Sequence, residues 1–394
     1  MSILGSVLHR IFAFCLALPL LAASPPAAFS EHTIASDLRA GYQVVAADLN
    51  GDGKLDLIAL GSGMTELVWY ENPTWQRHVI VSGVSRMINC AALVPKDGGI
   101  PDIVLASEFS MQAADSPGVV SVLRHNGDPR QPWTIQEIDR LPTSHRLRIA
   151  DIDGSGKNVV IGAPLTGAKA VPPDYRGQTP LVYYTPGDWK RQLISEENSG
   201  VVHCIYVIDW DGDGRDEILT ASFTGIHLFK LGADGRWSRT EIAKGDPAPW
   251  PKSGSSDVAV GRLGAARFLA AIEPWHGNQV AIYRQAGHDW ARQVIDATLV
   301  DAHTILTADL NGDGLDEVIA GYRGQGRSVY IYSASDAAGE RWSRTSLDAG
   351  GMGAAACVVA DLNGDGRPDI ACIDSTRLKW YENLGVPKAA APAK

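Results

Sequence analysis

Three histidines precede acidic loops by the same interval. His145, His203 and His303 stand six residues before Asp151, Asp209 and Asp309, respectively. Neutral imidazoles are good ligands for Zn²⁺, and three protein ligands that leave one position open are typical of a catalytic zinc site. If the three segments are equivalent elements of a repeat, their rings lie at one level and can meet at one metal. The alternative is that these histidines fill the mouth of a channel and bind ordered water.

The acidic loops themselves follow a cation-binding pattern. Four of them read Asp-x-Asn/Asp-Gly-Asp-Gly-x-x-Asp/Glu, with oxygen-bearing side chains at positions 1, 3, 5 and 9. Oxygen ligands at this spacing suit Ca²⁺, and the glycines allow the backbone to curl round an ion. We expect about four structural calcium sites. Their predicted ligands are Asp48, Asn50, Asp52 and Asp56; Asp209, Asp211, Asp213 and Glu217; Asp309, Asn311, Asp313 and Glu317; and Asp361, Asn363, Asp365 and Asp369.

Three related loops depart from this pattern. The loop Asp97–Asp102 keeps only its end, and Gly261–Gly264 has lost every ligand. The loop Asp151–Val159 lacks the carboxylate at position 9, so a cation there stays an open question. We expect none in the other two. Ions in such loops usually stabilise a hairpin, so they indicate little about activity.

The loops belong to a unit that recurs seven times along the chain. Each unit has an apolar strand, the loop, a second apolar strand, a third strand and a fourth strand that usually begins with Trp. The third strands are Leu67–Tyr70, Val120–Leu123, Leu181–Tyr184, Ile226–Phe229, Val280–Tyr283, Val329–Tyr332 and Leu378–Tyr381. The fourth strands are Trp75–Ile80, Trp133–Ile138, Trp189–Ile194, Trp237–Ile242, Trp290–Ile295 and Trp342–Leu347. Seven four-stranded units predict an all-β fold, a seven-bladed β-propeller.

The last unit lacks its fourth strand. The segment Glu31–Ile34 has the character of that missing strand. We therefore expect the N-terminal strand to complete the last blade, which closes the ring and removes exposed sheet edges. The propeller is predicted to span residues 31–385, and residues 386–394 are predicted to be a disordered tail.

Residues 1–30 have the features of a secretory signal peptide, with a basic start, a short apolar run and small residues after it. This predicts a secreted or periplasmic protein. No later segment is long and apolar enough to span a membrane. The net charge of -10 disfavours nucleic acid as a partner. The oligomeric state stays open.

Four cysteines follow the predicted cleavage region, and all lie in apolar runs: Cys90, Cys204, Cys357 and Cys372. We expect buried free thiols. The alternative is a disulfide between Cys357 and Cys372, which would face each other across the last hairpin.

Long loops between the strands gather at the same end of the propeller as the three histidines. They include segments 108–115, 164–176, 245–253, 273–279 and 321–327. These segments supply aromatic, basic and acidic side chains, and such a mixture suits a sugar, whose CH faces stack on rings while its hydroxyls form hydrogen bonds.

The acidic loops resemble the FG-GAP/VCBS repeats of integrin-type propellers. The histidines, the Glu273–Gln279 loop and the Pro164–Lys169 loop resemble the propeller domain of aldos-2-ulose dehydratases. This resemblance implies zinc in the propeller and lyase or isomerase activity on keto sugars such as 1,5-anhydrofructose. The fungal members continue into cupin domains, whereas this sequence ends after the propeller, which puts any step that needs those domains in doubt.

The resemblance also implies roles for individual residues. A metal at the three histidines would stabilise an enolate. The first candidate for proton transfer is His276, followed by Glu108, Asp174 and Tyr175. The candidates for binding the substrate are Arg146, Arg148, Lys169, Trp250, Lys252 and Trp275. A non-catalytic propeller that binds glycans or proteins is the first alternative. A polysaccharide lyase with a deep basic groove is the second.

Overall fold

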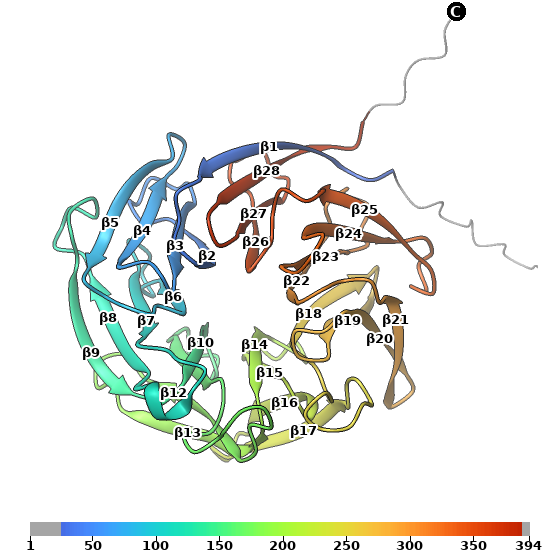
Figure 1. Ribbon diagram of the computed structural model, residues 1–394, viewed down its shortest axis with the longest axis horizontal. Coiled ribbons are helices and arrows are strands. Elements are labelled where there is room, and N and C mark those ends of the chain that lie inside the picture. Colours follow the sequence, from blue (N-terminus) through green and yellow to red (C-terminus); the bar gives the residue numbers. More distant parts are fainter. Residues whose placement is uncertain (1–24, 388–394) are drawn as a thin grey trace, which may run out of the picture.

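The short apolar runs form strands that assemble into seven four-stranded antiparallel sheets around a central axis (Figure 1). The structure is a computed structural model that describes residues 25–387. The predicted seven-bladed, all-β propeller is confirmed. Most of the predicted signal peptide and tail (1–24 and 388–394) lies outside the described residues. Within residues 25–387, no helix has the length and hydrophobicity that a membrane crossing requires.

The first four blades follow one another along the chain. Blade 1 contains β2 (Gly41–Ala47), β3 (Asp56–Gly61), β4 (Glu66–Glu71) and β5 (Gln76–Ser82). Blade 2 contains β6 (Asn89–Leu93), β7 (Asp102–Ser107), the short 3-10 helix η1 (Ala113–Asp115), β8 (Val119–Arg124) and β9 (Thr134–Arg140). Blade 3 contains β10 (Ser144–Ala150), β11 (Val159–Pro164), β12 (Gln178–Tyr184) and β13 (Arg191–Ser199). Blade 4 contains β14 (Val202–Ile208), β15 (Glu217–Ser222), β16 (Gly225–Leu231) and β17 (Trp237–Ala243).

The remaining blades complete the ring. Blade 5 contains β18 (Asp257–Leu263), β19 (Ala266–Glu273), β20 (Gln279–Ala286) and β21 (Asp289–Asp296). Blade 6 contains β22 (Ala302–Ala308), β23 (Glu317–Tyr322), β24 (Ser328–Ala334) and β25 (Trp342–Asp348). Blade 7 contains β26 (Ala356–Ala360), β27 (Asp369–Ile373), β28 (Leu378–Gly385) and, from the other end of the chain, β1 (Ala28–Ala35).

The hydrophobic core lies between the blades. Second strands such as β3 and β15 are buried along their whole length because a neighbouring blade packs on each face. Fourth strands such as β9 form the outer wall and are mostly exposed. Most core clusters combine residues from two adjacent blades. Packing between the blades therefore holds the innermost strands in place, and the first residues of these strands line one end of a central channel.

The ring is closed as the sequence predicted, by β1 pairing with β28 (Figure 1). β1 begins at Ala28, within the segment assigned to the leader peptide. Lys379 connects the closing strand to blade 6 through one half-exposed and one buried ion pair. The Lys379 ammonium on β28 lies 2.7 Å from Glu31 on β1 and 2.8 Å from Asp348 at the end of β25. Burial alone would raise the pKa of Asp348, but the bonds from Lys379 and Tyr381 hold it below its usual value.

Replacing Lys379 with methionine is expected to lower the free energy of unfolding by about 3 kcal/mol, because the Asp348 carboxylate would stay buried without its counter-charge. The loss should shrink as the pH falls through the lowered pKa of Asp348, where the carboxylate becomes protonated in both variants. Urea unfolding at neutral and acid pH measures both effects. Arg77→Met, which removes a solvent-exposed pair with Glu66, is the control and should change stability by less than about 1 kcal/mol.

The cysteines differ in part from the prediction. Cys90 and Cys204 are buried free thiols, as expected. Cys357 and Cys372 instead form a disulfide, because they face each other directly across β26 and β27. The expectation of four free thiols is therefore wrong for this pair.

Candidate functional site

Four innermost strands contain an extra residue at the same position. The pairing of β2, β10, β14 and β22 with the second strands skips one residue in each, and the skipped residues are Tyr42, His145, His203 and His303. The innermost strands β6, β18 and β26 pair without a break. A β-bulge of this kind redirects a side chain and is common beside active sites. The bulges direct all four rings into the channel. The six-residue interval between each of the three histidines and the following acidic loop results from this equivalent position in the blades.

The four rings converge within the channel. The Tyr42 hydroxyl lies 3.0 Å from Nε2 of His145 and 3.3 Å from Nε2 of His303. The ring of His203 lies 5.1 Å from that of His145 and 4.9 Å from that of His303. The three histidines are almost fully buried. Histidines from blades 3, 4 and 6 thus meet at one level, as their spacing predicts.

A fourth histidine joins the cluster from a loop. His276, between β19 and β20, places its Nε2 3.4 Å from Nε2 of His203. His203, His276 and His303 each offer a nitrogen within 4.8 Å of the other two. His145, which the sequence grouped with His203 and His303, lies beside them but outside this set, and its Nε2 contacts Tyr42 and, at 3.2 Å, Arg146. The set best placed to hold one metal therefore contains His276 rather than His145.

Backbone carbonyls orient two of these rings. The Nδ1 atom of His203 lies 3.2 Å from the carbonyl oxygen of Ser256, and Nδ1 of His303 lies 2.5 Å from that of Ala355. A carbonyl oxygen only accepts, so Nδ1 carries the proton and the Nε2 lone pair faces the cluster. Metal-binding histidines are typically held this way. Burial lowers the pKa of His203 and His303 well below the usual value. This set of neutral donors fits Zn²⁺ or a similar divalent metal.

His276 is held by charged residues on its outer side. Its Nδ1 lies 3.4 Å from the Asp301 carboxylate, and Arg323 binds the same carboxylate at 2.9 Å. Burial and the charge of Arg323 lower the pKa of His276 to about 4, although Asp301 acts in the opposite direction. His276 and Asp301 both have positive φ, 48° and 56°, a strained conformation for these residues that is most often found at functional sites. A carboxylate behind an imidazole is a common support for a metal ligand.

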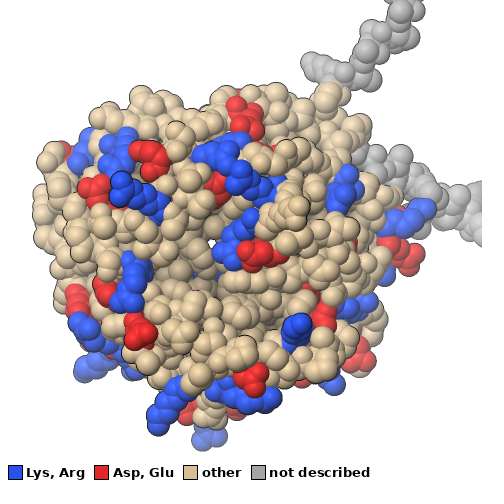
Figure 2. Space-filling view, viewed as in Figure 1, with Lys and Arg blue, Asp and Glu red and all other residues tan. Residues whose placement is uncertain are grey.

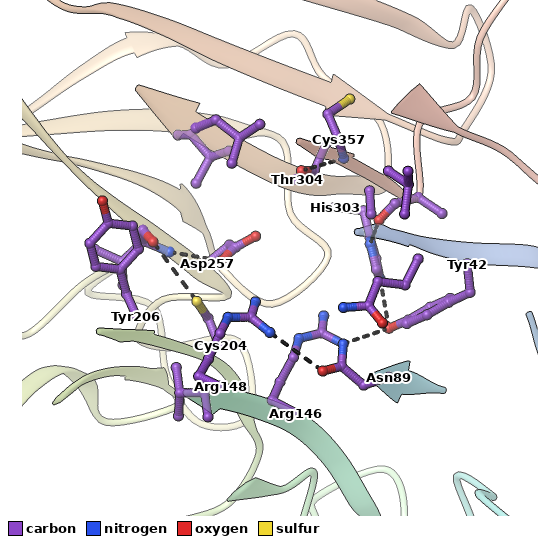
Figure 3. Close-up of a pocket in the computed structure, with 18 residues that line it drawn as sticks. Tyr42, Asn89, Arg146, Arg148, Cys204, Tyr206, Asp257, His303, Thr304 and Cys357 are labelled. Atoms are coloured by element: carbon purple, nitrogen blue, oxygen red, sulfur yellow. Dashed lines mark hydrogen bonds between the residues drawn. The ribbon is translucent and has the colours of Figure 1, made fainter. Parts of the chain in front are cut away.

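Arg146 is the most unusual charge in the site. It is 7% exposed, and its guanidinium contacts Tyr42 at 3.4 Å, His145 at 3.2 Å and His203 at 3.5 Å. Among residues 25–387 it forms no ion pair. Arg146 lines a cavity of about 110 Å³ together with Tyr42, Arg148, Asp257 and His303. Figure 3 shows Arg146 and Arg148 extending into this cavity from one strand. The buried Asp257 in the same cavity acts on Arg146 through its charge without a direct ion pair, so the guanidinium is also placed to bind an anionic oxygen on a ligand.

Two predicted substrate-binding residues, Trp275 and Trp250, form an aromatic wall beside His276, and the predicted catalytic candidate Tyr175 is part of this wall. The ring of Trp275 lies 4.7 Å from that of His276, and the Tyr175 ring meets Trp275 edge-on at 5.7 Å. Trp250 continues the wall through Phe223, which lies between it and Trp275. Lys169 and Lys252 are exposed on the neighbouring loops.

Two predicted catalytic carboxylates are engaged elsewhere. Glu108 binds Ser85 at 2.6 Å and pairs with Arg86 at 2.5 Å, and both contacts lower its pKa. The Asp174 carboxylate pairs with Arg176 at 3.5 Å. Within the described part of the chain, neither carboxylate contacts the histidines. Both lie on loops of the expected end, but their side chains are bound to local arginines.

Three members of the site were not predicted. Tyr42 was recognisable, because it occupies the histidine position in blade 1. Asp301 gave no signal, and Arg323 was included only as part of the segment 321–327, since the importance of both depends on His276, which comes from another blade. Figure 2 shows positive and negative side chains interspersed around a central depression, without a continuous basic band on the face shown. That face gives no support to a polyanion-binding groove.

The four acidic loops share one internal geometry. The position-1 aspartate accepts a bond from the glycine three residues on, as in Asp309 with Gly312 at 2.7 Å. The position-9 carboxylate is buried and accepts the backbone N–H of position 2, as in Glu317 with Leu310 at 2.9 Å. Burial and neighbouring carboxylates raise the pKa of Glu317 to about 7 and that of Asp56 to about 6. This crowding of carboxylates fits a cation, and calcium there stays a prediction. The loop Asp151–Val159 lacks its own position-9 carboxylate, and there the Asp216 carboxylate of blade 4 accepts the backbone N–H of Asp151 at 2.7 Å. Whether this loop binds a cation stays an open question.

Comparison with known proteins supports the repeat and the resemblance to a dehydratase propeller domain. Residues 117–286 match the family described as aldos-2-ulose dehydratase, beta-propeller domain. Residues 309–372 match the FG-GAP-like repeat, and residues 40–65 match the FG-GAP repeat. The aldos-2-ulose dehydratase of Phanerodontia chrysosporium is 27% identical over 326 residues, which cover 72% of this chain and 35% of that protein. The chain therefore spans about a third of the length of that relative.

Solved structures show the same fold at low identity. A complex of BBS1N with ARL6DN has a chain with a TM-score of 0.57 and 13% identity, covering 94% of this chain and 99% of that one. An Agrocybe aegerita lectin specific for non-reducing terminal N-acetylglucosamine gives a TM-score of 0.51 and 14% identity, covering 79% of this chain and 81% of the lectin. Likeness at this identity concerns the fold alone. The chain is a seven-bladed β-propeller that contains segments matching FG-GAP repeats and resembles the propeller domain of aldos-2-ulose dehydratase.

Proposed function

We propose that the protein is a secreted, metal-dependent carbohydrate lyase or isomerase that removes water from keto sugars. The observation that carries this proposal is the convergence of His203, His276 and His303 on one point of a buried channel. The resemblance to the propeller domain of a dehydratase supplies the substrate class. The signal-peptide pattern supports secretion or a periplasmic location, and calcium in the acidic loops would serve the scaffold.

His203, His276 and His303 would hold Zn²⁺ or a similar divalent metal. When bound, such a metal supplies a Lewis acid for the carbonyl oxygen of the sugar. The carbonyl oxygens of Ser256 and Ala355 and the carboxylate of Asp301 keep the three rings oriented. His276, first assigned to proton transfer, thus becomes a ligand in this proposal, and His145 takes the proton-transfer role in its place.

His145 and Tyr42 are suited to move protons beside the metal ligands. Nε2 of His145 would take the proton from the carbon next to the carbonyl, and the C–H electron pair would form the carbon–carbon double bond. The Tyr42 hydroxyl, 3.0 Å from this nitrogen, would give a proton to the departing β-hydroxyl and regain one from His145. One water leaves and an enone remains, so atoms and charge balance.

Arg146 would stabilise the negative oxygen that develops on the sugar. Its two terminal nitrogens face the histidine cluster. No carboxylate within residues 25–387 forms a direct ion pair with them, although the charge of Asp257 acts on them from a distance. Replacing Arg146 with glutamine is expected to lower kcat by about 10²-fold, the usual cost of losing one oxyanion donor. Metal content should stay unchanged. Steady-state kinetics with metal analysis measures both, and an unchanged kcat would contradict this role.

Enone formation tests the proposed reaction directly. The purified secreted form, loaded with zinc, is incubated with 1,5-anhydrofructose and with a 3-keto sugar, and the ultraviolet absorbance of an enone is followed. We expect enone from at least one substrate with wild-type protein and with His288→Ala, which changes an exposed histidine outside the site. No enone from several keto sugars with metal-replete protein would contradict the proposal.

A binding-only propeller is the competing function. The aromatic wall of Trp275, Tyr175 and Trp250 would serve glycan recognition without catalysis. In that case glycan binding would persist when His203, His276 and His303 are replaced together by alanine, and no turnover would be found. Isothermal titration with the triple variant separates the two functions.

A further inference from the structure

One position beside the acidic loops differs in charge from blade to blade. In each of the four blades with a complete loop, the residue after loop position 9 pairs with the aromatic residue of the third strand. These pairs are Leu57 with Tyr70, Ile218 with Phe229, Val318 with Tyr332 and Ile370 with Tyr381. The residue that follows each aromatic therefore lies opposite loop position 9. It is Glu71 in blade 1, Lys230 in blade 4, Ser333 in blade 6 and Glu382 in blade 7.

In blade 4 this position places an ammonium within the loop. Nζ of Lys230 contacts the carboxylate of Asp211, and it lies 3.0 Å from the carboxylates of both Asp213 and Glu217. These are loop positions 3, 5 and 9, the side chains predicted to bind calcium. An ammonium has three N–H donors, and three carboxylates satisfy them. The same contacts raise the pKa of Lys230.

Blades 1 and 7 have the opposite charge at this position. Glu71 accepts a bond from the Asn50 amide at 3.1 Å, and Glu382 accepts one from the Asn363 amide at 3.3 Å. Each of these loops therefore has an additional carboxylate beside its position-3 residue, and each carboxylate also pairs outside the loop, Glu71 with Arg130 and Glu382 with His32. In blade 6 the equivalent residue is the neutral Ser333.

Blade 4 also differs at position 3 of the loop, which is Asp211 where the other three loops have asparagine. The extra carboxylate and the lysine thus occur together. A carboxylate and a lysine are expected together where a side chain of the protein, and not a bound ion, neutralises the negative charge of the loop. A divalent ion would have to displace an ammonium from three of its ligands, and like charges at this distance repel strongly.

We propose that the Lys230 ammonium is the resident cation of the blade 4 loop, and that of the four complete loops only those in blades 1, 6 and 7 bind calcium. This inference does not depend on the proposed catalytic activity. It also revises the expected number of calcium sites from four to three. The blade 4 loop follows β14, the strand that contains His203. If Lys230 neutralises this loop, the strand is held in place without a metal ion.

Calcium titration of the full chain and of reciprocal variants tests the proposal. Chelator-treated protein is titrated with Ca²⁺ to about 5 mM, which exceeds the affinities usual for extracellular calcium modules. Three sites are expected in wild-type protein. The double variant Asp211→Asn with Lys230→Ser copies blade 6 and should bind a fourth ion. The reciprocal variant Ser333→Lys should lose one site and bind two ions.

Four comparable sites in wild-type protein would overturn the proposal, and so would an unchanged stoichiometry in both variants. Circular dichroism melting in excess calcium shows whether each variant is folded. The two variants change different blades, so one folded variant suffices for the test. The histidine cluster adds no fourth site to the count, because imidazole nitrogens are poor ligands for calcium.

Discussion

Replacing His203 with alanine is expected to abolish zinc retention and to lower enone formation by at least about 10³-fold. The variant removes one of three neutral nitrogens from a buried site, and two remaining ligands hold zinc poorly. Without the metal, the carbonyl oxygen of a keto sugar loses its Lewis acid, which contributes several kcal/mol to such reactions. Metal analysis by emission spectrometry and ultraviolet kinetics measure the two effects on the same preparation.

Two matched variants show whether the loss of zinc and of turnover is specific to the proposed metal ligands. His288→Ala removes an exposed histidine and should leave zinc content and turnover unchanged. His145→Ala should retain zinc but lose turnover, because His203, His276 and His303 already offer three nitrogens within 4.8 Å of one another. If His203→Ala keeps both its zinc and its activity, the channel histidines are not the catalytic centre.

Removal of calcium is expected to destabilise the ring more than any single substitution considered above. A ligand present at 100 times its dissociation constant stabilises the folded state by about 2.7 kcal/mol, so three such sites contribute about 8 kcal/mol. Without ions, the position-9 carboxylates Asp56, Glu317 and Asp369 stay buried beside like charges. Denaturant unfolding with and without excess chelator measures the difference.

Magnesium provides the control for this effect. Mg²⁺ prefers a small octahedral site and gives up its waters reluctantly, so an equal concentration should restore only part of the lost stability. Identical unfolding curves with calcium and with chelator would contradict a structural role for the loops.

The fold was predictable because each blade repeats the same local rules. Apolar strands that alternate with glycine-rich loops predict each hairpin separately. Ring closure follows because the last unit lacks a fourth strand, which the N-terminal segment can supply. The common position of His145, His203 and His303 was also predictable, since equivalent strands are of equal length. The bulges explain why these side chains face the channel, and the sequence pattern contains no sign of the bulges themselves.

The rest of the site depends on contacts between blades that are distant in the sequence. His276 reaches the cluster from a loop of blade 5, and Asp301 and Arg323 from blade 6 orient it. No spacing rule connects these residues. Glu108 illustrates the reverse error, because its loop is at the right end but Arg86 binds its carboxylate. Lys230 was overlooked for a similar reason, since its effect on the loop follows from strand pairing and not from the loop pattern.

X-ray absorption spectroscopy of the zinc-loaded protein tests most directly whether imidazoles from three blades hold one metal. The account predicts one zinc per chain with three nitrogen neighbours at about 2.0–2.1 Å, the usual zinc–imidazole distance. It also predicts that this signal disappears in His276→Ala and persists in His145→Ala. A zinc signal that survives His276→Ala unchanged, or a protein that retains no zinc at all, would contradict it.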